Sequence, residues 1–174
     1  MRLIYSKTPC SQPGDSMIPR KLPKMNAAEV KELLEEQILC RIAFCGKQGP
    51  HIAPFQYALV NGQLYFHFTD YGKKMELLEE GNLVCVEIEK YTSDLSEYRF
   101  VVATGKLRIV TEPGERALAI EKMVDAAKTK GLSENFLLAH GYSKGKGWDS
   151  LNPETQLVIV KLENLTGYVG LKSP

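Results

Sequence analysis

The stretch that organises this chain is LYFHFTDYGKKMELL, residues 64–78. Its first half alternates, which predicts a strand with an apolar face and a mixed face. The apolar face is Leu64, Phe66 and Phe68, and the mixed face is Tyr65, His67 and Thr69. Beyond Gly72 the apolar residues fall at helical spacing until Gly81, so a short helix is expected to begin at Tyr71 or Gly72. A strand therefore runs through a tight turn directly into a helix.

The charge order of this helix is the reverse of the usual one. Lys73 and Lys74 stand in the first turn, where the partial positive charge of a helix N-terminus favours carboxylates. An anion bound there would meet free backbone N–H groups, two ammonium groups and the Thr69 hydroxyl, so the order predicts a phosphate site. The alternative is a solvated helix in which Lys73 pairs with Glu76, a contact worth about 0.2–0.5 kcal/mol.

The segment before this strand predicts a β-hairpin. Asn61-Gly62 is strongly favoured in two-residue turns of type I′, and such a turn places Val60 opposite Gln63. Counting outward from this pair places Gln56 opposite His67 and Pro54 opposite Thr69. The opposite face supplies the core candidates, which are Phe55, Tyr57, Leu59, Leu64, Phe66 and Phe68. Pro54 cannot donate to a ladder, so backbone groups of residues 54–57 are expected to be free to meet a ligand.

The rest of the chain reads as strands with a few helices. The expected elements are a helix over 27–37 with Asn26 and Glu29 as its capping box, strands at 40–45, 83–89, 98–111, 156–162 and 166–171, and a helix over 113–130. Gly105 inside a strand predicts a bend or bulge. This pattern favours an α+β antiparallel barrel with peripheral helices over a doubly wound sheet. Residues 1–24, rich in proline, are expected to form an extended or partly disordered arm with Met17 as an alternative start, and residues 25–174 to form one domain.

Composition narrows the partners. The chain has 174 residues, with 22 Lys and Arg against 21 Asp and Glu, a balance that attracts neither nucleic acid nor a membrane surface. Its apolar runs are shorter than a membrane span, and its N-terminus lacks the apolar stretch of a signal peptide, so we expect a cytoplasmic protein. The four cysteines and three histidines have no metal-ligating spacing, so neither a disulfide nor a metal site is expected.

A glycine-rich basic segment, HGYSKGKGW at residues 140–148, precedes the last long strand. It is not a P-loop, because that motif has four residues between its glycines and a Ser or Thr directly after its Lys. Two interpretations remain. It is a mobile basic loop, or it is a lid that brings Trp148, the only tryptophan, onto a planar ligand.

The hairpin at residues 51–69, followed by Gly72-Lys73-Lys74, resembles the FMN-binding split barrel of the pyridoxamine 5′-phosphate oxidase-like superfamily. Within it, the nitroimidazole-reductase-like branch is the most similar. The resemblance extends from about Arg20 to Leu162 and includes the strand Tyr98–Lys106, which helps to build the cofactor cleft between subunits. It implies a homodimer with two FMN molecules at the subunit interface.

The resemblance also implies site residues. Thr69, Lys73 and Lys74 would hold the phosphate, and Pro54, Phe55, Gln56 and Tyr57 the isoalloxazine edge. The other cofactor-binding positions that it suggests are His67, Phe68, Gly72, Arg99, Val101 and Trp148. His67 is also the expected catalytic residue, placed to orient or protonate an acceptor.

Two classes of function follow from the resemblance. The first is an FMN-dependent reductase of small electrophiles such as nitroaromatics, with NADH or NADPH as donor. The second is a flavin-binding carrier or redox sensor without a dedicated substrate. The chain lacks the Arg-x-His-type substrate motif of true pyridoxamine phosphate oxidases, so vitamin B6 oxidation is not expected. Other branches bind a deazaflavin or haem, and the phosphate-binding residues do not exclude a deazaflavin.

Overall fold

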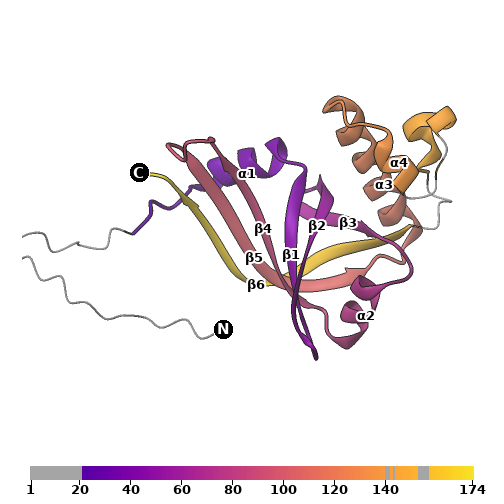
Figure 1. Cartoon of the computed structure of the whole chain (residues 1–174), viewed down its shortest axis with the longest axis horizontal. Coiled ribbons are helices and arrows are strands. Elements are labelled where there is room, and N and C mark those ends of the chain that lie inside the picture. The colour runs from indigo at the N-terminus through magenta and orange to yellow at the C-terminus, as the bar shows by residue number, and fades with distance from the viewer. Residues whose placement is uncertain (1–20, 140–141, 143, 153–156) are drawn as a thin grey trace, which may run out of the picture.

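The computed structural model describes residues 21–139, 142, 144–152 and 157–174. Within these residues, six antiparallel strands close into a barrel in the order β1-β2-β3-β6-β5-β4 (Figure 1). The strands are β1 (Leu39–Gly46), β2 (Gly49–Val60), β3 (Gln63–Phe68), β4 (Leu83–Tyr91), β5 (Tyr98–Ile109) and β6 (Val158–Lys172). The helices are α1 (Ala27–Glu36), α2 (Lys73–Glu80), α3 (Pro113–Thr129), α4 (Asn135–Ala139) and the 3₁₀ helix η1 (Lys144–Ser150). The expected α+β antiparallel barrel with peripheral helices is confirmed.

The first part of the expected N-terminal arm, including Met17, lies outside the described residues. Where the description begins, Lys24 forms an isolated bridge with Leu171, and the Lys172 N–H donates to the Pro23 carbonyl. The capping box of α1 is confirmed, because Asn26 and Glu29 exchange hydrogen bonds between side chain and backbone. None of the helices in the described part of the chain combines the length and apolar character needed to cross a membrane.

The hairpin between β2 and β3 has the predicted turn and register. Asn61 and Gly62 have φ angles of 51° and 78°, as a type I′ turn requires, and Val60 lies opposite Gln63. The ladder between β2 and β3 ends at the pair Tyr57–Phe66, and the part of β2 from Gln56 back to Gly49 pairs with β1. The two strands therefore part just before the positions of Gln56 and His67, and the barrel is split there.

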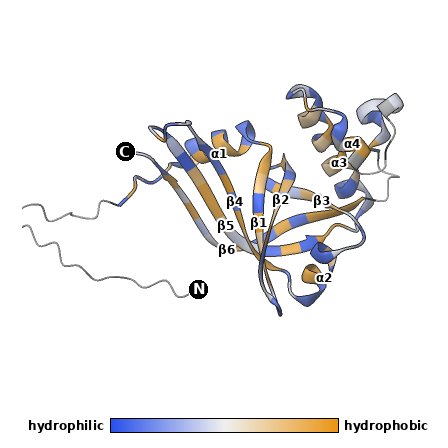
Figure 2. Ribbon diagram, viewed as in Figure 1, coloured by the Kyte–Doolittle hydropathy of each residue, from blue (hydrophilic) through white to orange (hydrophobic). Residues whose placement is uncertain are grey.

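Two apolar clusters lie on opposite sides of the strands, which carry much of the apolar sequence (Figure 2). The barrel interior holds the predicted core residues Phe55, Tyr57, Leu64, Phe66 and Phe68, with Leu59 partly buried beside them. α1 adds Val30 and Leu33 and α2 adds Leu77 to this cluster. The second cluster joins the outer side of β2, β3 and β6 to α3 and η1, and it includes Ala58, Tyr65, Ile159, Ile120, Met123 and Trp148.

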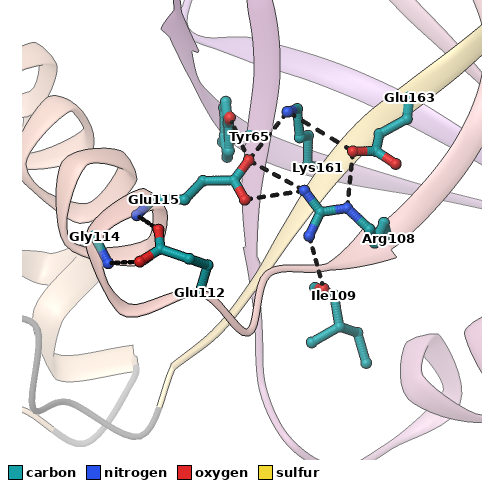
Figure 3. A network of polar contacts seen from close by, with 8 residues as sticks. All are labelled: Tyr65, Arg108, Ile109, Glu112, Gly114, Glu115, Lys161 and Glu163. Carbon is teal, nitrogen blue, oxygen red and sulfur yellow. Dashed lines mark hydrogen bonds and ion pairs between the residues drawn. The ribbon is translucent and has the colours of Figure 1, made fainter.

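An ion-pair network fixes α3 against this outer side (Figure 3). The Glu115 carboxylate accepts hydrogen bonds from Arg108 Nη2 at 3.0 Å, Lys161 Nζ at 3.0 Å and Tyr65 Oη at 2.8 Å. Arg108 Nε also donates to Glu163 at 2.8 Å. Partial burial acts to raise the pKa of Glu115, but the three donors outweigh it and hold this pKa at about 2. Glu115 lies in the first turn of α3, so the network attaches the start of that helix to β3, β5 and β6.

The C-terminal part of the barrel corrects one expectation. The two strands expected at 156–162 and 166–171 are one strand, β6, which pairs with β5 along its length. The register shifts between Thr104 and Lys106, and a Cβ on Gly105 would lie 2.6 Å from the Glu163 carbonyl oxygen. Asn164, opposite this bulge, has a φ of 50°. The irregularity that looked like a gap between strands is a bend within a single strand.

Candidate functional site

The split between β2 and β3 opens into a groove of about 490 Å³, within the size range of small-molecule sites. It is lined by Ile38, Leu39, Pro54, Phe55, Gln56, His67, Thr69, Lys74, Leu132 and Ser133. The sequence-predicted residues among them are Pro54, Phe55, Gln56, His67, Thr69 and Lys74. The hairpin register explains why these residues lie together. Carried beyond the last paired residues, it places Pro54 opposite Thr69 and Gln56 opposite His67.

One end of the groove is the start of α2. The helix begins after Gly72, whose φ of 89° suits glycine, and no side chain caps its first N–H groups. The Thr69 hydroxyl donates to the Tyr71 carbonyl at 2.9 Å, which leaves its oxygen able to accept a hydrogen bond. Lys74 Nζ lies 4.7 Å from the centre of the Phe55 ring, at the groove. Lys73 forms the pair with Glu76 that the simpler interpretation predicts, at 3.4 Å on the exposed side.

The middle of the groove carries two buried polar side chains, Gln56 and His67, each 8% exposed. Both also line a small hollow behind the groove, whose other walls are Ile120, Met123, Trp148, Leu151 and Leu157. His67 thus faces away from the barrel interior, as the alternation predicts. Its face is covered by the apolar cluster under α3, however, so His67 is buried between the groove and an apolar layer.

Several sequence-predicted residues lie away from the groove. Tyr57, Phe68 and Val101 point into the barrel interior. Phe68 stacks on Phe55 at 4.7 Å between ring centres, and the Tyr57 hydroxyl donates to the Leu34 carbonyl at 2.8 Å. Burial raises the pKa of Tyr57. These residues support the site from within the barrel.

Arg99 and Trp148 also stand apart from the open groove. Arg99 binds Glu32 and Glu36 of α1, at 2.8 and 2.6 Å, so neither it nor Val101 reaches the groove of its own chain. Trp148 is 8% exposed beneath α3, where it lines the hollow behind His67. The structure places this ring behind the groove in the apolar cluster. His140, Gly141 and Ser143 of the glycine-rich segment lie outside the described residues.

Sequence reasoning missed four groove residues, Ile38, Leu39, Leu132 and Ser133. They follow directly after α1 and α3, and their meeting depends on how the two helix ends pack. The helix ends themselves were predictable from Gln37 and Gly131. Local sequence patterns, however, do not predict how close the end of α1 lies to the end of α3 in space.

An exposed face of the barrel adjoins the groove. Leu39 is 59% and Ile52 64% exposed, and both point outward from β1 and β2. Next to them Arg41 binds Glu87 at 3.4 Å, and it also binds Glu89. Partial burial and the neighbouring Glu89 raise the pKa of Glu87. The groove therefore opens beside a partly apolar sheet surface that no described helix covers.

Comparisons with known proteins point in one direction. A family model described as pyridoxamine 5′-phosphate oxidase matches residues 26–169. No curated protein matches the sequence. Solved structures of other proteins share the fold of this chain at sequence identities of 18% or less, for example the three that follow. A conserved hypothetical protein from Mycobacterium tuberculosis has a TM-score of 0.66 and 18% identity, with 89% of each chain covered.

Two others are named for a function. A putative 5-nitroimidazole antibiotic resistance protein from Bacteroides thetaiotaomicron has a TM-score of 0.59 and 15% identity, covering 91% of this chain and 96% of that one. An FAD binding protein from Mycobacterium smegmatis has a TM-score of 0.56 and 16% identity, covering 87% of this chain and 100% of that one.

Proposed function

The chain belongs to the pyridoxamine 5′-phosphate oxidase family, and from that membership we propose that its groove binds FMN and that the protein is an FMN-dependent reductase of small electrophiles such as nitroaromatics. One observation carries the proposal. A groove of suitable size joins the uncapped start of a helix, with a lysine beside it, to a buried histidine.

The start of α2 fits a phosphate group. Its free N–H groups need acceptors, and no side chain among the described residues caps them. Lys74 adds a positive charge at the groove. The Thr69 hydroxyl, whose proton is donated to the Tyr71 carbonyl, can accept from a water that bridges to the phosphate. A dianion here would also balance the reversed charge order of the helix. FMN carries such a phosphate, which riboflavin lacks.

The middle of the groove fits the isoalloxazine ring. Pro54, Phe55 and Gln56 form one wall, and the Gln56 amide can both donate to and accept from the polar edge of a flavin. When bound, the flavin supplies the transfer of hydride or electrons from a reduced nicotinamide to an acceptor. The apolar side chains Leu39 and Leu132 would cover part of the bound ring and reduce its contact with water. A ring nitrogen of His67 would orient the acceptor and give it a proton.

The groove is open on one side, and we expect a second copy of the chain to close it. The exposed face that contains Leu39, Ile52 and Pro54 adjoins the groove, and apolar surface of this kind supports association. A homodimer would then hold two FMN molecules, one in each groove, at its interface.

The proposal is tested by an absorption titration of the purified protein with FMN, FAD and riboflavin, followed by NADH and NADPH with a 5-nitroimidazole. We expect FMN to bind more tightly than riboflavin, since only FMN offers a phosphate to α2. We also expect steady oxidation of one nicotinamide when the nitroimidazole is present. FMN binding without turnover would favour the carrier or sensor, and failure to bind FMN would refute the proposal.

The buried histidine favours the reductase over the carrier. A carrier needs a phosphate site and a ring pocket, and it has no need of a proton donor beside the ring. His67 lies at the level of Gln56, in the middle of the groove, where an acceptor stacked on the ring would lie.

A further inference from the structure

The end of α3 is built to return the chain toward the barrel. Lys130 is the C-cap, and Gly131 follows with a φ of 61°. The Gly131 N–H donates to the Lys128 carbonyl at 3.2 Å, and the Leu132 N–H donates to the Ala127 carbonyl at 2.9 Å. These two bonds form a Schellman motif, which fixes the direction of the chain after the helix. That direction brings Leu132 and Ser133 to the groove.

The Lys130 side chain reaches a different helix. Its Nζ donates to the carbonyls of Glu35 at 2.8 Å, Glu36 at 2.6 Å and Gln37 at 3.2 Å, at the end of α1. An ammonium group has three donors, and here all three are used. α1 has no basic residue in its own last turn, so Lys130 supplies the positive charge and the hydrogen bonds that its C-terminus needs.

The two segments that Lys130 joins form one end of the groove. Ile38 and Leu39 follow α1, and Leu132 and Ser133 follow α3. This end is remote from α2. Carried beyond its last pair, the hairpin register places Pro54 at the level of Thr69 and Gln56 at the level of His67. At the next residue of β2, the Tyr57 N–H donates to the Ile38 carbonyl at 3.1 Å. The groove therefore runs from α2, past His67, to the walls that Lys130 holds.

We propose that Lys130 is a positioning residue that fixes the width of the groove at the end remote from α2 and thereby limits the size of the acceptor admitted beside His67. The limit on acceptors rests on the proposed function, in which the phosphate lies at α2 and the ring at Pro54–Gln56. The positioning itself rests only on the contacts of Lys130.

Three variants test the proposal. Lys130→Met keeps most of the unbranched apolar side chain and removes the charge and the donors, and Lys130→Arg keeps both charge and donors. Lys122→Met is the matched control, because Lys122 lies on the same helix and, within the part of the chain that the structure describes, binds Glu121 and Asp125 of that helix alone. The first measurement is amide hydrogen exchange without added flavin, at residues 35–39 and 131–134. We expect Lys130→Met to exchange faster in both segments, while Lys130→Arg and Lys122→Met behave like the wild type. Unchanged exchange in Lys130→Met would overturn the proposal.

The second measurement compares kcat/KM for a one-ring and a two-ring nitroaromatic. We expect Lys130→Met to raise the ratio of two-ring to one-ring kcat/KM by about 10-fold, the scale on which pocket dimensions discriminate substrates. Lys130→Arg should show the wild-type ratio. FMN should still bind to Lys130→Met, because its phosphate lies at the other end of the groove. A wild-type ratio in Lys130→Met, with FMN bound, would overturn the size limit and leave the proposed function standing. A wild-type protein that binds no FMN would overturn the proposed function and the size limit together, and hydrogen exchange would then decide the positioning role alone.

Discussion

Lys73 and Lys74 are adjacent in sequence but meet different surroundings. Lys73 is exposed and paired with Glu76, whereas Lys74 lies over Phe55 at the groove. A charge-assisted hydrogen bond to phosphate contributes about 1.5–3 kcal/mol, so Lys74→Ala is expected to weaken FMN roughly 10- to 100-fold at low salt. Lys73→Ala should have a smaller effect on FMN affinity. Lys73 is exposed and is not among the residues that line the groove, and an ion pair between an exposed lysine and the phosphate would contribute little.

The affinities are measured by absorption titration at two salt concentrations. Riboflavin is the matched control ligand, since its affinity should be the same in the wild type and in Lys74→Ala. If the double variant Lys73→Ala, Lys74→Ala keeps wild-type FMN affinity, the phosphate does not bind at α2.

His67 is buried beside an apolar layer, which decides how it should be replaced. Alanine would leave a cavity next to Met123 and Trp148, so glutamine is the better substitution. We expect His67→Gln to bind FMN and to keep its melting temperature near that of the wild type. Its turnover of nitroaromatics should fall on the order of 10²–10⁴-fold, as for the loss of a positioned acid or base. His51→Gln, on β2 but absent from the groove lining, is the control. Wild-type turnover in His67→Gln would exclude a catalytic role.

The attachment of α3 to the barrel depends on one side chain outside the apolar clusters, that of Glu115. The folded-state pKa of Glu115, about 2, lies below its ordinary value of 4.5. Its network therefore contributes fully above pH 4.5, and the contribution is lost as the pH falls toward 2. We expect Glu115→Gln to lower the free energy of unfolding at pH 7 by about 1.5–3 kcal/mol.

This effect should shrink as the pH falls below 4.5, because the carboxylate of the unfolded wild type then binds a proton while that of the folded protein is still charged, which favours unfolding of the wild type. Urea unfolding at pH 7 and pH 3 measures it, with the exposed Glu121→Gln on the same helix as control. An equal difference between Glu115→Gln and the wild type at both pH values would contradict the assignment.

Elements with strong local signals were predictable from sequence. Asn61-Gly62 fixed the hairpin register, Gly72 the start of α2 and Asn26 the start of α1, because each depends on backbone conformation or capping within a few residues. β6 was divided in two because its bulge opposite Gly105 interrupts the alternation, while pairing with β5 holds it in one strand. The burial of His67 was missed for a similar reason. Alternation assigns a residue to a face, and only the packing of α3 decides whether that face is covered.

At the scale of the whole molecule, we expect the exposed face beside the groove to form the interface of the proposed dimer. In the proposed dimer, Ile52 lies in the interface without lining the groove of its own chain. Ile52→Lys is therefore expected to favour the monomer and, since the partner closes the groove, to weaken FMN as well. Sedimentation measured with and without FMN tests both effects. Leu118→Lys, an exposed apolar position on α3, is the control. An FMN-loaded monomer of the wild type would refute the shared site.

The position of Trp148 offers a second readout for the binding and unfolding measurements. It is the only tryptophan in the chain, and it lies behind His67 with one apolar hollow between itself and the groove. Its fluorescence is thus a built-in reporter that needs no label. A bound chromophore in the groove would quench this emission by energy transfer, whereas loosening of α3 would shift it toward the spectrum of a hydrated indole. Ligand occupancy and helix undocking, which affinity alone would confuse, have different optical signatures in this protein.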